Sequence, residues 1–165
     1  MAGTMLRTDS DVFRETPLRY LGYANEVGEA FRRFIGGKMV MATYGLATAY
    51  ALGDAAAKGT SEDEKCRSRA LEFGEATGGA VPRCTSRVAA VVADVVLWQG
   101  LASVAIPGFC VNRVVWAAGR ALKSTAWHST GPTAFGLACI PLMVKPIDEA
   151  VTGGMDAFVR PYLHS

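Results

Sequence analysis

The stretch VAAVVADVVLWQGLASVAIPGFCVNR, from Val88 to Arg113, decides the fold that the sequence predicts. From Val88 to Ile106 it runs for nineteen residues with one charge, Asp94, and Pro107-Gly108 then interrupts the apolar run. A helix that spans a bilayer needs about 20 mainly apolar residues, whereas about 10 to 14 indicate a buried helix of a soluble protein. We therefore expect residues 88–106 to span a membrane, and the helix to break or kink at Pro107-Gly108.

The charge of Asp94 makes this span dependent on neighbouring helices. Nine Val, Leu and Ile residues contribute roughly −3 to −5 kcal/mol to insertion, and one central Asp costs about +2.5 to +3.5 kcal/mol. The sum is near zero or mildly favourable. We therefore expect Asp94 to face protein inside a helical bundle. Asp94 and Gln99 are the candidates for polar contacts between helices within the membrane.

Charged residues are segregated along the chain of 165 residues. Of the 32 formal charges, eleven lie in 58–87 and ten in the first 37 residues, whereas 124–144 carries none. Soluble amphipathic helices would intersperse charge at the helical spacing. The sequence therefore predicts one all-α integral-membrane domain, 1–165: a membrane helical bundle with about three transmembrane segments plus amphipathic interfacial helices. Its expected parts are an amphipathic helix at 16–35, a span at 38–57, a polar connector at 58–87, a span at 88–106, a basic, Trp-containing interfacial helix or fourth span at 109–128, and a span at 129–146.

The first expected helix has one apolar and one polar side. It begins at Thr16-Pro17, a typical helix start, and ends at Gly36-Gly37, a typical stop. Glu29 and Arg33 on its polar side have the spacing of an ion pair. Such a helix lies in the membrane interface or docks on neighbouring helices, and the alternative is core packing in a soluble bundle.

The segment 38–57 carries a repeat of small residues. Gly45, Ala49 and Gly53 recur every four residues and predict a face that lets another backbone approach closely, unless the repeat is chance. Asp54 is expected at the membrane interface. In the connector, Ser61 to Phe73 is expected to form a short separate helix.

A basic face marks the segment 109–128. Its members fall within an arc of about 80° at the helical period: Arg113, Trp116, Arg120, Lys123 and Trp127. Cations and tryptophans together suit a phospholipid headgroup zone, and anionic lipids such as cardiolipin are candidate ligands. The alternative is a solvated face with two incidental tryptophans.

Catalytic, metal and nucleic-acid signatures are missing from the sequence. No CxxC motif occurs among the four cysteines, which are Cys66, Cys84, Cys110 and Cys139. Two histidines are too few to complete a zinc site. Cys110 and Cys139 are expected to be small buried hydrophobes. The sequence lacks GxSxG, HExxH and GxGxxG, and its net charge is only +2. We expect no enzyme activity, metal, cofactor or nucleic-acid partner.

Two long motifs carry a family resemblance. RYLGYANEVGEAFR, Arg19 to Arg32, and WQGLASVAIPGFCVNR, Trp98 to Arg113, resemble the mitochondrial fission process protein family, and YGLATAYALGDAAAKG from Tyr44 and IPLMVKPID from Ile140 extend the match. The sequence departs from the family pattern in the connector, from Lys58 to Pro82, and in the tail beyond Asp148. The resemblance implies a small multi-span protein of the mitochondrial inner membrane, associated with mitochondrial division and inner-membrane integrity. It implies no catalytic residue.

Three functions are compatible with these features. The first is a non-enzymatic factor in inner-membrane organisation and mitochondrial division, with membrane lipids and other inner-membrane proteins as partners. The second is an accessory structural subunit of a respiratory complex or ATP synthase in that membrane. The third, a transporter with Asp94 as its ion or proton site, is disfavoured because the chain has no clear inverted repeat and too few spans for a self-contained pathway.

Overall fold

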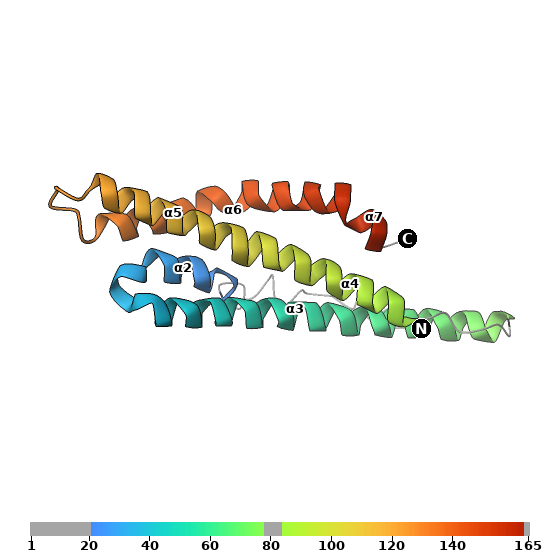
Figure 1. Ribbon diagram of the computed structural model, residues 1–165. Helices are drawn as coiled ribbons and strands as arrows, with labels where there is room; N and C mark the ends of the chain where they lie inside the picture. The colour runs from blue at the N-terminus through green and yellow to red at the C-terminus, as the bar shows by residue number, and fades with distance from the viewer. Residues whose placement is uncertain (1–20, 78–83, 164–165) are drawn as a thin grey trace, which may run out of the picture.

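Three long helical rods lie side by side in the computed structural model, which describes residues 21–77 and 84–163 (Figure 1). The first rod is α3 (Arg32–Thr77). The second joins α4 (Cys84–Gln99), the π-helix η2 (Gly100–Ala105) and α5 (Ile106–Ala121), and the third is α6 (Gly131–Phe158) followed by α7 (Arg160–Leu163). The short helix α2 (Ala24–Ala30) contacts α3, α5 and α6. The described residues contain no strand, so the all-α prediction is confirmed, while the expected helix start at Thr16-Pro17 lies outside them.

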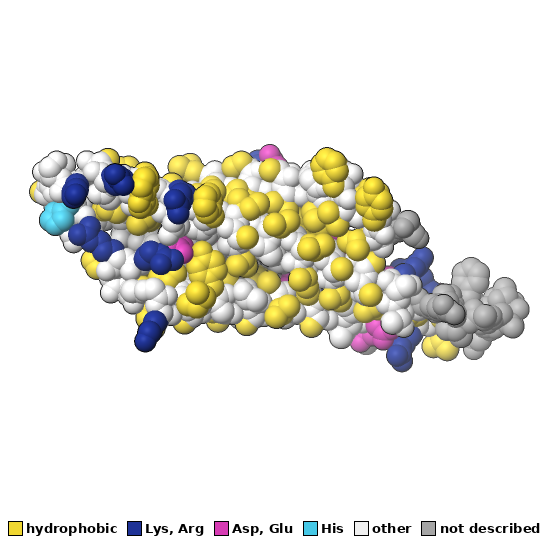
Figure 2. All heavy atoms as spheres, viewed as in Figure 1, with side chains coloured by type: hydrophobic (Ala, Val, Ile, Leu, Met, Phe, Trp, Pro, Cys, Tyr) yellow, Lys and Arg dark blue, Asp and Glu magenta, His cyan; other side chains and the backbone are white. Residues whose placement is uncertain are grey.

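The bundle buries several polar side chains and exposes many large apolar ones. Its buried apolar residues, among those described, are mainly alanine and valine, and Ala102, Val151 and Met155 form a hydrophobic cluster where α6 packs on η2. Fully buried side chains include five polar ones, at most 5% exposed: Asn25, Glu26, Glu29, Asp54 and Gln99. Figure 2 shows apolar side chains spread over the middle of the rods and charged ones towards the ends. In soluble proteins charged side chains are almost never fully buried unless paired, and large exposed apolar patches mark interaction or membrane surfaces.

Helix α2 shows this inversion most clearly. Asn25, Glu26 and Glu29 point into the bundle, whereas Val27 is 41% and Phe31 36% exposed. The two faces expected from the sequence are present, but core packing in a soluble bundle would require the apolar face inside. The predicted pair with Arg33 is wrong, because Glu29 pairs with Arg32 three residues on.

The first rod differs from the sequence in its length. Gly36 has φ 74° and ψ 165°, a left-handed conformation that favours glycine, so the predicted stop at Gly36-Gly37 is confirmed as a kink inside α3. The expected separate helix from Ser61 to Phe73 is wrong as a distinct element. Instead, α3 runs without a further break from the kink to Thr77.

The second rod passes through Pro107 without a break, so of the two alternatives at Pro107-Gly108 the break is wrong and the kink stays a prediction. Pro107 has no N–H to donate. The preceding turn widens into η2, where the Ile106 N–H bonds to the Leu101 carbonyl five residues earlier. The helix then ends at Ala121, short of the predicted 128. In the third rod α6 likewise continues past 146, through Pro141 and Pro146, to Phe158.

One helix among the described residues is both long and apolar enough to cross a membrane. It is the rod Cys84–Ala121, with 38 residues and a mean hydropathy of 1.8, and 11% of its most apolar window is buried. The further spans expected at 38–57 and 129–146 are therefore not confirmed.

Close helix contacts lie away from the predicted small-residue face. Gly45 and Ala49 are exposed, and a Cβ on Gly45 would meet no atom within 4 Å, so no described helix approaches that face and its use for close packing stays a prediction. A methyl group on Gly28 would instead overlap the Thr43 side chain. One on Gly136 would lie 3.3 Å from the Ala30 backbone. In α3 it is Gly59 that lies close to another helix, because a methyl group there would overlap the Val92 side chain of α4.

Candidate functional site

The polar side chains inside the bundle form the candidate site, called here the polar core. Its best-connected member is Glu29 of α2, which accepts hydrogen bonds from three neighbours. Arg32 donates at 2.7 and 2.6 Å, Tyr44 of α3 at 3.1 Å and Asn112 of α5 at 2.9 Å. Charge-assisted hydrogen bonds are about twice as strong as neutral ones. Glu29 therefore joins three helices through one carboxylate.

Asn25 ties α2 to the π-helix. Its Nδ2 donates to the Val104 carbonyl at 3.0 Å. The approach depends on Gly108, where a methyl group would overlap the Tyr44 hydroxyl and lie 3.1 Å from Asn25 Nδ2. The widened turn before Pro107 thus coincides with a contact to α2, as π-helical turns often do at functional sites.

Glu26 lies one turn before Glu29 in a different environment. It is 1% exposed, and neither carboxylate oxygen has a hydrogen-bond partner. Burial raises the pKa of Glu26 from 4.5 to about 7. Burial also acts on Glu29, but hydrogen bonds from Arg32 and Asn112 outweigh it and hold the pKa of Glu29 below its usual value. With seven residues, α2 is too short to span a bilayer.

Asp54 of α3 carries the second part of the polar core. It is 1% exposed, so the prediction that it lies at the membrane interface is wrong. Gln99 of α4 and Lys58 each donate to its Oδ2 at 2.8 Å, and Ser103 donates to Gln99 Oε1 at 2.7 Å. The error arises because α3 continues past Lys58, which places Asp54 within a helix instead of at its end.

Asp94 of α4 pairs with Arg160 of α7. Arg160 Nε donates to Oδ1 at 2.8 Å and Nη2 to Oδ2 at 3.2 Å, and Arg160 also reaches Asp156 at 2.6 Å. Both residues proposed for polar contacts between helices, Asp94 and Gln99, thus have partners in another helix. That these contacts lie within a membrane stays a prediction.

The five residues proposed to bind lipid headgroups are all exposed, as Trp116 at 55% and Trp127 at 67% illustrate. Arg113 and Arg120 lie on α5, where the Arg120 guanidinium stacks 4.8 Å above the Trp116 ring. Lys123 and Trp127 follow the end of α5, so the predicted single helical face is wrong for these two. Arg33 joins them by donating to the His128 carbonyl. We call Arg33, Arg113, Arg120 and Lys123 the basic end.

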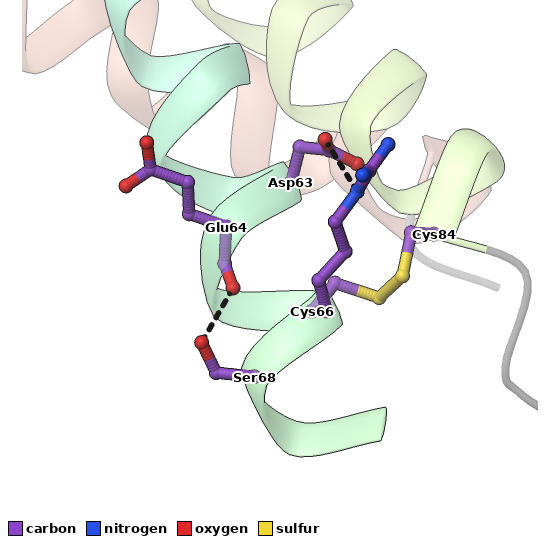
Figure 3. Close-up of a disulfide and its surroundings, with 6 residues drawn as sticks. Asp63, Glu64, Cys66, Ser68 and Cys84 are labelled. Carbon is purple, nitrogen blue, oxygen red and sulfur yellow. Dashed lines mark hydrogen bonds and ion pairs between the residues drawn. A yellow bond between two sulfur atoms is a disulfide. The ribbon is translucent and has the colours of Figure 1, made fainter. Parts of the chain in front are cut away.

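A disulfide links the second rod to α3 at the end that lies opposite the basic end. It joins Cys66 of α3 to Cys84, the first residue of α4 (Figure 3). The spacing of the cysteines did not predict this bond, although Cys66 and Cys84 are the two cysteines inside the polar connector. Cys110 and Cys139 are free and half-buried, so the prediction that they are buried is wrong.

The described residues contain no group of three or more His, Cys, Asp or Glu side chains that could hold a metal ion. No element of the polar core pairs a nucleophile with a base. Its groups instead connect helices or, at Glu26, remain without a partner. The arrangement can position helices and bind charge, which is what a structural or ligand-binding site requires.

Comparison with known proteins gives the family. The model of the Mitochondrial 18 KDa protein (MTP18) family matches residues 7–155. Mitochondrial fission process protein 1 of Danio rerio is 43% identical over 91% of this chain and 87% of its own length. The Homo sapiens protein of the same name is 41% identical over 92% of this chain and 87% of its own length. No solved structure matches the chain. The chain therefore belongs to the Mitochondrial 18 KDa protein family, which confirms the resemblance seen in its motifs.

Proposed function

We propose that this chain is a non-enzymatic, multi-pass protein of the mitochondrial inner membrane that acts in mitochondrial division by organising that membrane. The name of its relatives supports the process. The observation that carries the membrane location is the inverted burial, with five polar side chains inside and Met41 (71%) and Leu142 (77%) exposed outside. In lipid, apolar side chains face outward and intramembrane ionisable groups face the bundle interior.

The three rods have the length of membrane spans. At 1.5 Å per residue, the 38 residues of Cys84–Ala121 extend about 57 Å and the 28 residues of α6 about 42 Å. A hydrocarbon core is about 30 Å thick. Each rod can therefore cross it and project beyond it. We propose that α3, the second rod and α6 are the three spans.

The basic end supplies a surface for anionic headgroups. Residues 95–147 contain no acidic residue, so nothing acidic in this part of the sequence offsets Arg113, Arg120 and Lys123. Each Lys or Arg near an anionic surface contributes about 1 kcal/mol. We propose cardiolipin or a similar anionic lipid as the ligand of this end.

The disulfide supports one orientation. Lys and Arg do not distinguish the two ends, because the connector 58–87 also carries six of them. The bond between Cys66 and Cys84 persists in an oxidising compartment, which favours the intermembrane space for the end that carries it. Protease added to mitoplasts should therefore cut the connector between α3 and α4 and spare the turn around His128. Protection of the connector with cleavage of the turn would refute this orientation.

The test of the proposed function has two arms. Alkaline carbonate extraction should leave the protein in the membrane pellet, and its release into the supernatant would refute the spans. Depletion of the protein should elongate the mitochondrial network, because division slows while fusion continues, and re-expression should restore it. An unchanged network would refute a role in division while leaving the membrane location intact.

An accessory structural subunit of a respiratory complex or ATP synthase is the second candidate. The exposed small residues Gly45 and Ala49 of α3 favour it, since they leave a face on which a helix of another protein can approach closely. Native electrophoresis after mild detergent extraction separates the two candidates. Comigration with a large complex would support the subunit, and migration only as a small free species would exclude it.

A further inference from the structure

A cavity of about 290 Å³ lies between α2, α3, α4 with η2, and α6, and the proposed function does not use it. Its polar and aromatic lining residues come from all these elements: Glu26, Tyr50, Trp98, Gln99, Ser103 and Asp148, with Tyr23 just before α2. Two of them are acidic and three are aromatic. No lysine, arginine or histidine is among the described residues that line it.

Glu26 points to a missing ligand. It is 1% exposed, and both of its oxygens lack a hydrogen-bond donor. A buried carboxylate without a counter-charge is strongly unfavourable, which is why buried charges are paired in folded proteins. Glu29, one turn away, has three partner residues within the chain. The described chain supplies none for Glu26, so a positive group from outside it would complete this site.

The walls are suited to an organic cation. Aromatic faces attract ammonium groups through cation–π interaction, and cages of aromatic side chains are a common way to bind quaternary ammonium. The Trp98 indole is held by its hydrogen bond to Thr152 at 3.0 Å. Gln99 is held between Asp54 and Ser103. A rigid wall of this kind lowers the entropy cost of binding.

A bare metal ion fits the cavity less well than an organic cation. The described residues offer no cluster of three or more metal-binding side chains, and the cavity is wider than a dehydrated ion requires. Ethanolammonium and trimethylammonium groups instead match its size, its negative charge and its aromatic lining.

We propose that this cavity binds an organic ammonium group, with Glu26 as its counter-ion. The group comes either from the headgroup of an ethanolamine or choline phospholipid or from a free amine of similar size. The lipid source rests on the proposed membrane location, whereas the free amine does not. Failure of the membrane proposal and failure of the cavity proposal are therefore distinguishable.

The test compares Glu26→Gln with Glu149→Gln in the full-length protein. Glutamine keeps the size of Glu26 and removes its charge. Glu149 lies next to Asp148 on α6 but is exposed, so its substitution changes net charge equally outside the cavity. Circular dichroism confirms that each variant is folded. Tyr50→Leu, which removes one aromatic wall, serves as a second cavity variant.

Two kinds of ligand are offered to each protein in mild detergent. Native mass spectrometry measures retention of phosphatidylethanolamine, phosphatidylcholine and, as the control lacking an ammonium group, phosphatidylglycerol. Thermal shift titration measures the binding of two free cations, added as ethanolamine hydrochloride and tetramethylammonium chloride. Loss of the ion pair should weaken ammonium binding about tenfold or more in Glu26→Gln. Tyr50→Leu should weaken it less, and Glu149→Gln should bind like the wild type.

Each outcome decides the proposal. Binding of the ethanolamine or choline lipids alone identifies the headgroup as the source, and binding of the free cations alone identifies a soluble amine. Equal binding by wild type and Glu26→Gln would overturn the proposal. So would no binding of any ammonium compound by the wild type. Retention of phosphatidylglycerol that is the same in wild type and Glu26→Gln reports the basic end and not the cavity.

Discussion

Replacing Glu26 with glutamine should stabilise the protein at neutral and alkaline pH. The folded protein holds the pKa of this carboxyl at about 7, against 4.5 for the ordinary value. The difference of about 2.5, at about 1.36 kcal/mol for each pKa unit, corresponds to about 3 kcal/mol. Because the folded state binds more protons than the unfolded state between pH 4.5 and 7, stability falls as the pH rises through this window. Glutamine does not titrate, so the variant lacks this fall.

Chemical unfolding of both proteins in mild detergent, without added amine, measures the effect between pH 4 and pH 8. The gain in the free energy of unfolding should be near zero below pH 4.5 and rise to about 3 kcal/mol above pH 7. The other titratable groups of the cavity, Tyr23, Tyr50 and Asp148, are present in both proteins. Their direct contributions cancel in the difference between the two proteins.

Glu29→Gln is the opposing control. Because Glu29 is hydrogen-bonded to Arg32, Tyr44 and Asn112, its loss should destabilise the protein by about 2 kcal/mol or more at pH 7. A Glu26→Gln variant that is less stable than wild type above pH 7, or whose gain does not change with pH, would refute the assignment of Glu26 as a buried carboxyl without a partner.

Further predictions concern helix packing and the two ends of the second rod. Gly28→Ala should lower the free energy of unfolding by about 1–3 kcal/mol, because its methyl group overlaps Thr43. Gly45→Ala should raise it by up to about 1 kcal/mol, and equal effects at both sites would contradict the packing. A double-mutant cycle of Asp94→Asn with Arg160→Gln should give a coupling of about 1–2 kcal/mol, since the pair is bidentate and partly buried. The corresponding cycle of Asp156→Asn with Arg160→Gln should give a coupling of about 0.5 kcal/mol, because Asp156 is exposed. A larger coupling for Asp156 than for Asp94 would mean that Asp156 is the main partner of Arg160. Cys84→Ser should cost about 3 kcal/mol under oxidising conditions and nothing once the wild type is reduced, which thermal unfolding with and without reductant checks.

The sequence predicted the helical content and the two faces of α2, but not which face turns inward. Helical periodicity separates Glu26 and Glu29 from Val27 and Phe31 without saying what surrounds the helix. The inward direction depends on Tyr44 and Asn112, which lie 15 and 83 residues from Glu29 along the chain. Such long-range partners leave no periodic signal.

Predictions of helix breaks and ends from single residues were wrong where a neighbouring element satisfies the groups that such a residue leaves unpaired. Pro107 predicts a break, but the wider turn of η2 before it lets the helix continue to Ala121. Asp54 was placed at a helix end because charged residues follow Lys58, yet α3 continues to Thr77 and Gln99 covers the carboxylate. The intramembrane charge of Asp94 predicts a protein partner, but that partner, Arg160, lies 66 residues away in the tail, which carries no pattern that identifies it.

The acids inside the bundle follow one pattern. Between helices in lipid there is little hydrophobic driving force, so polar contacts and close backbone packing specify how helices pair. Glu29 joins α2 to α3 and α5, Asp54 joins α3 to α4, and Asp94 joins α4 to α7. Each of these carboxylates therefore fixes at least one junction. Glu26 is as deeply buried but fixes none, because both of its oxygens face no donor within the described chain. A buried acid that does not contribute to helix pairing is a cost to stability, and a cation in the adjoining cavity would offset that cost.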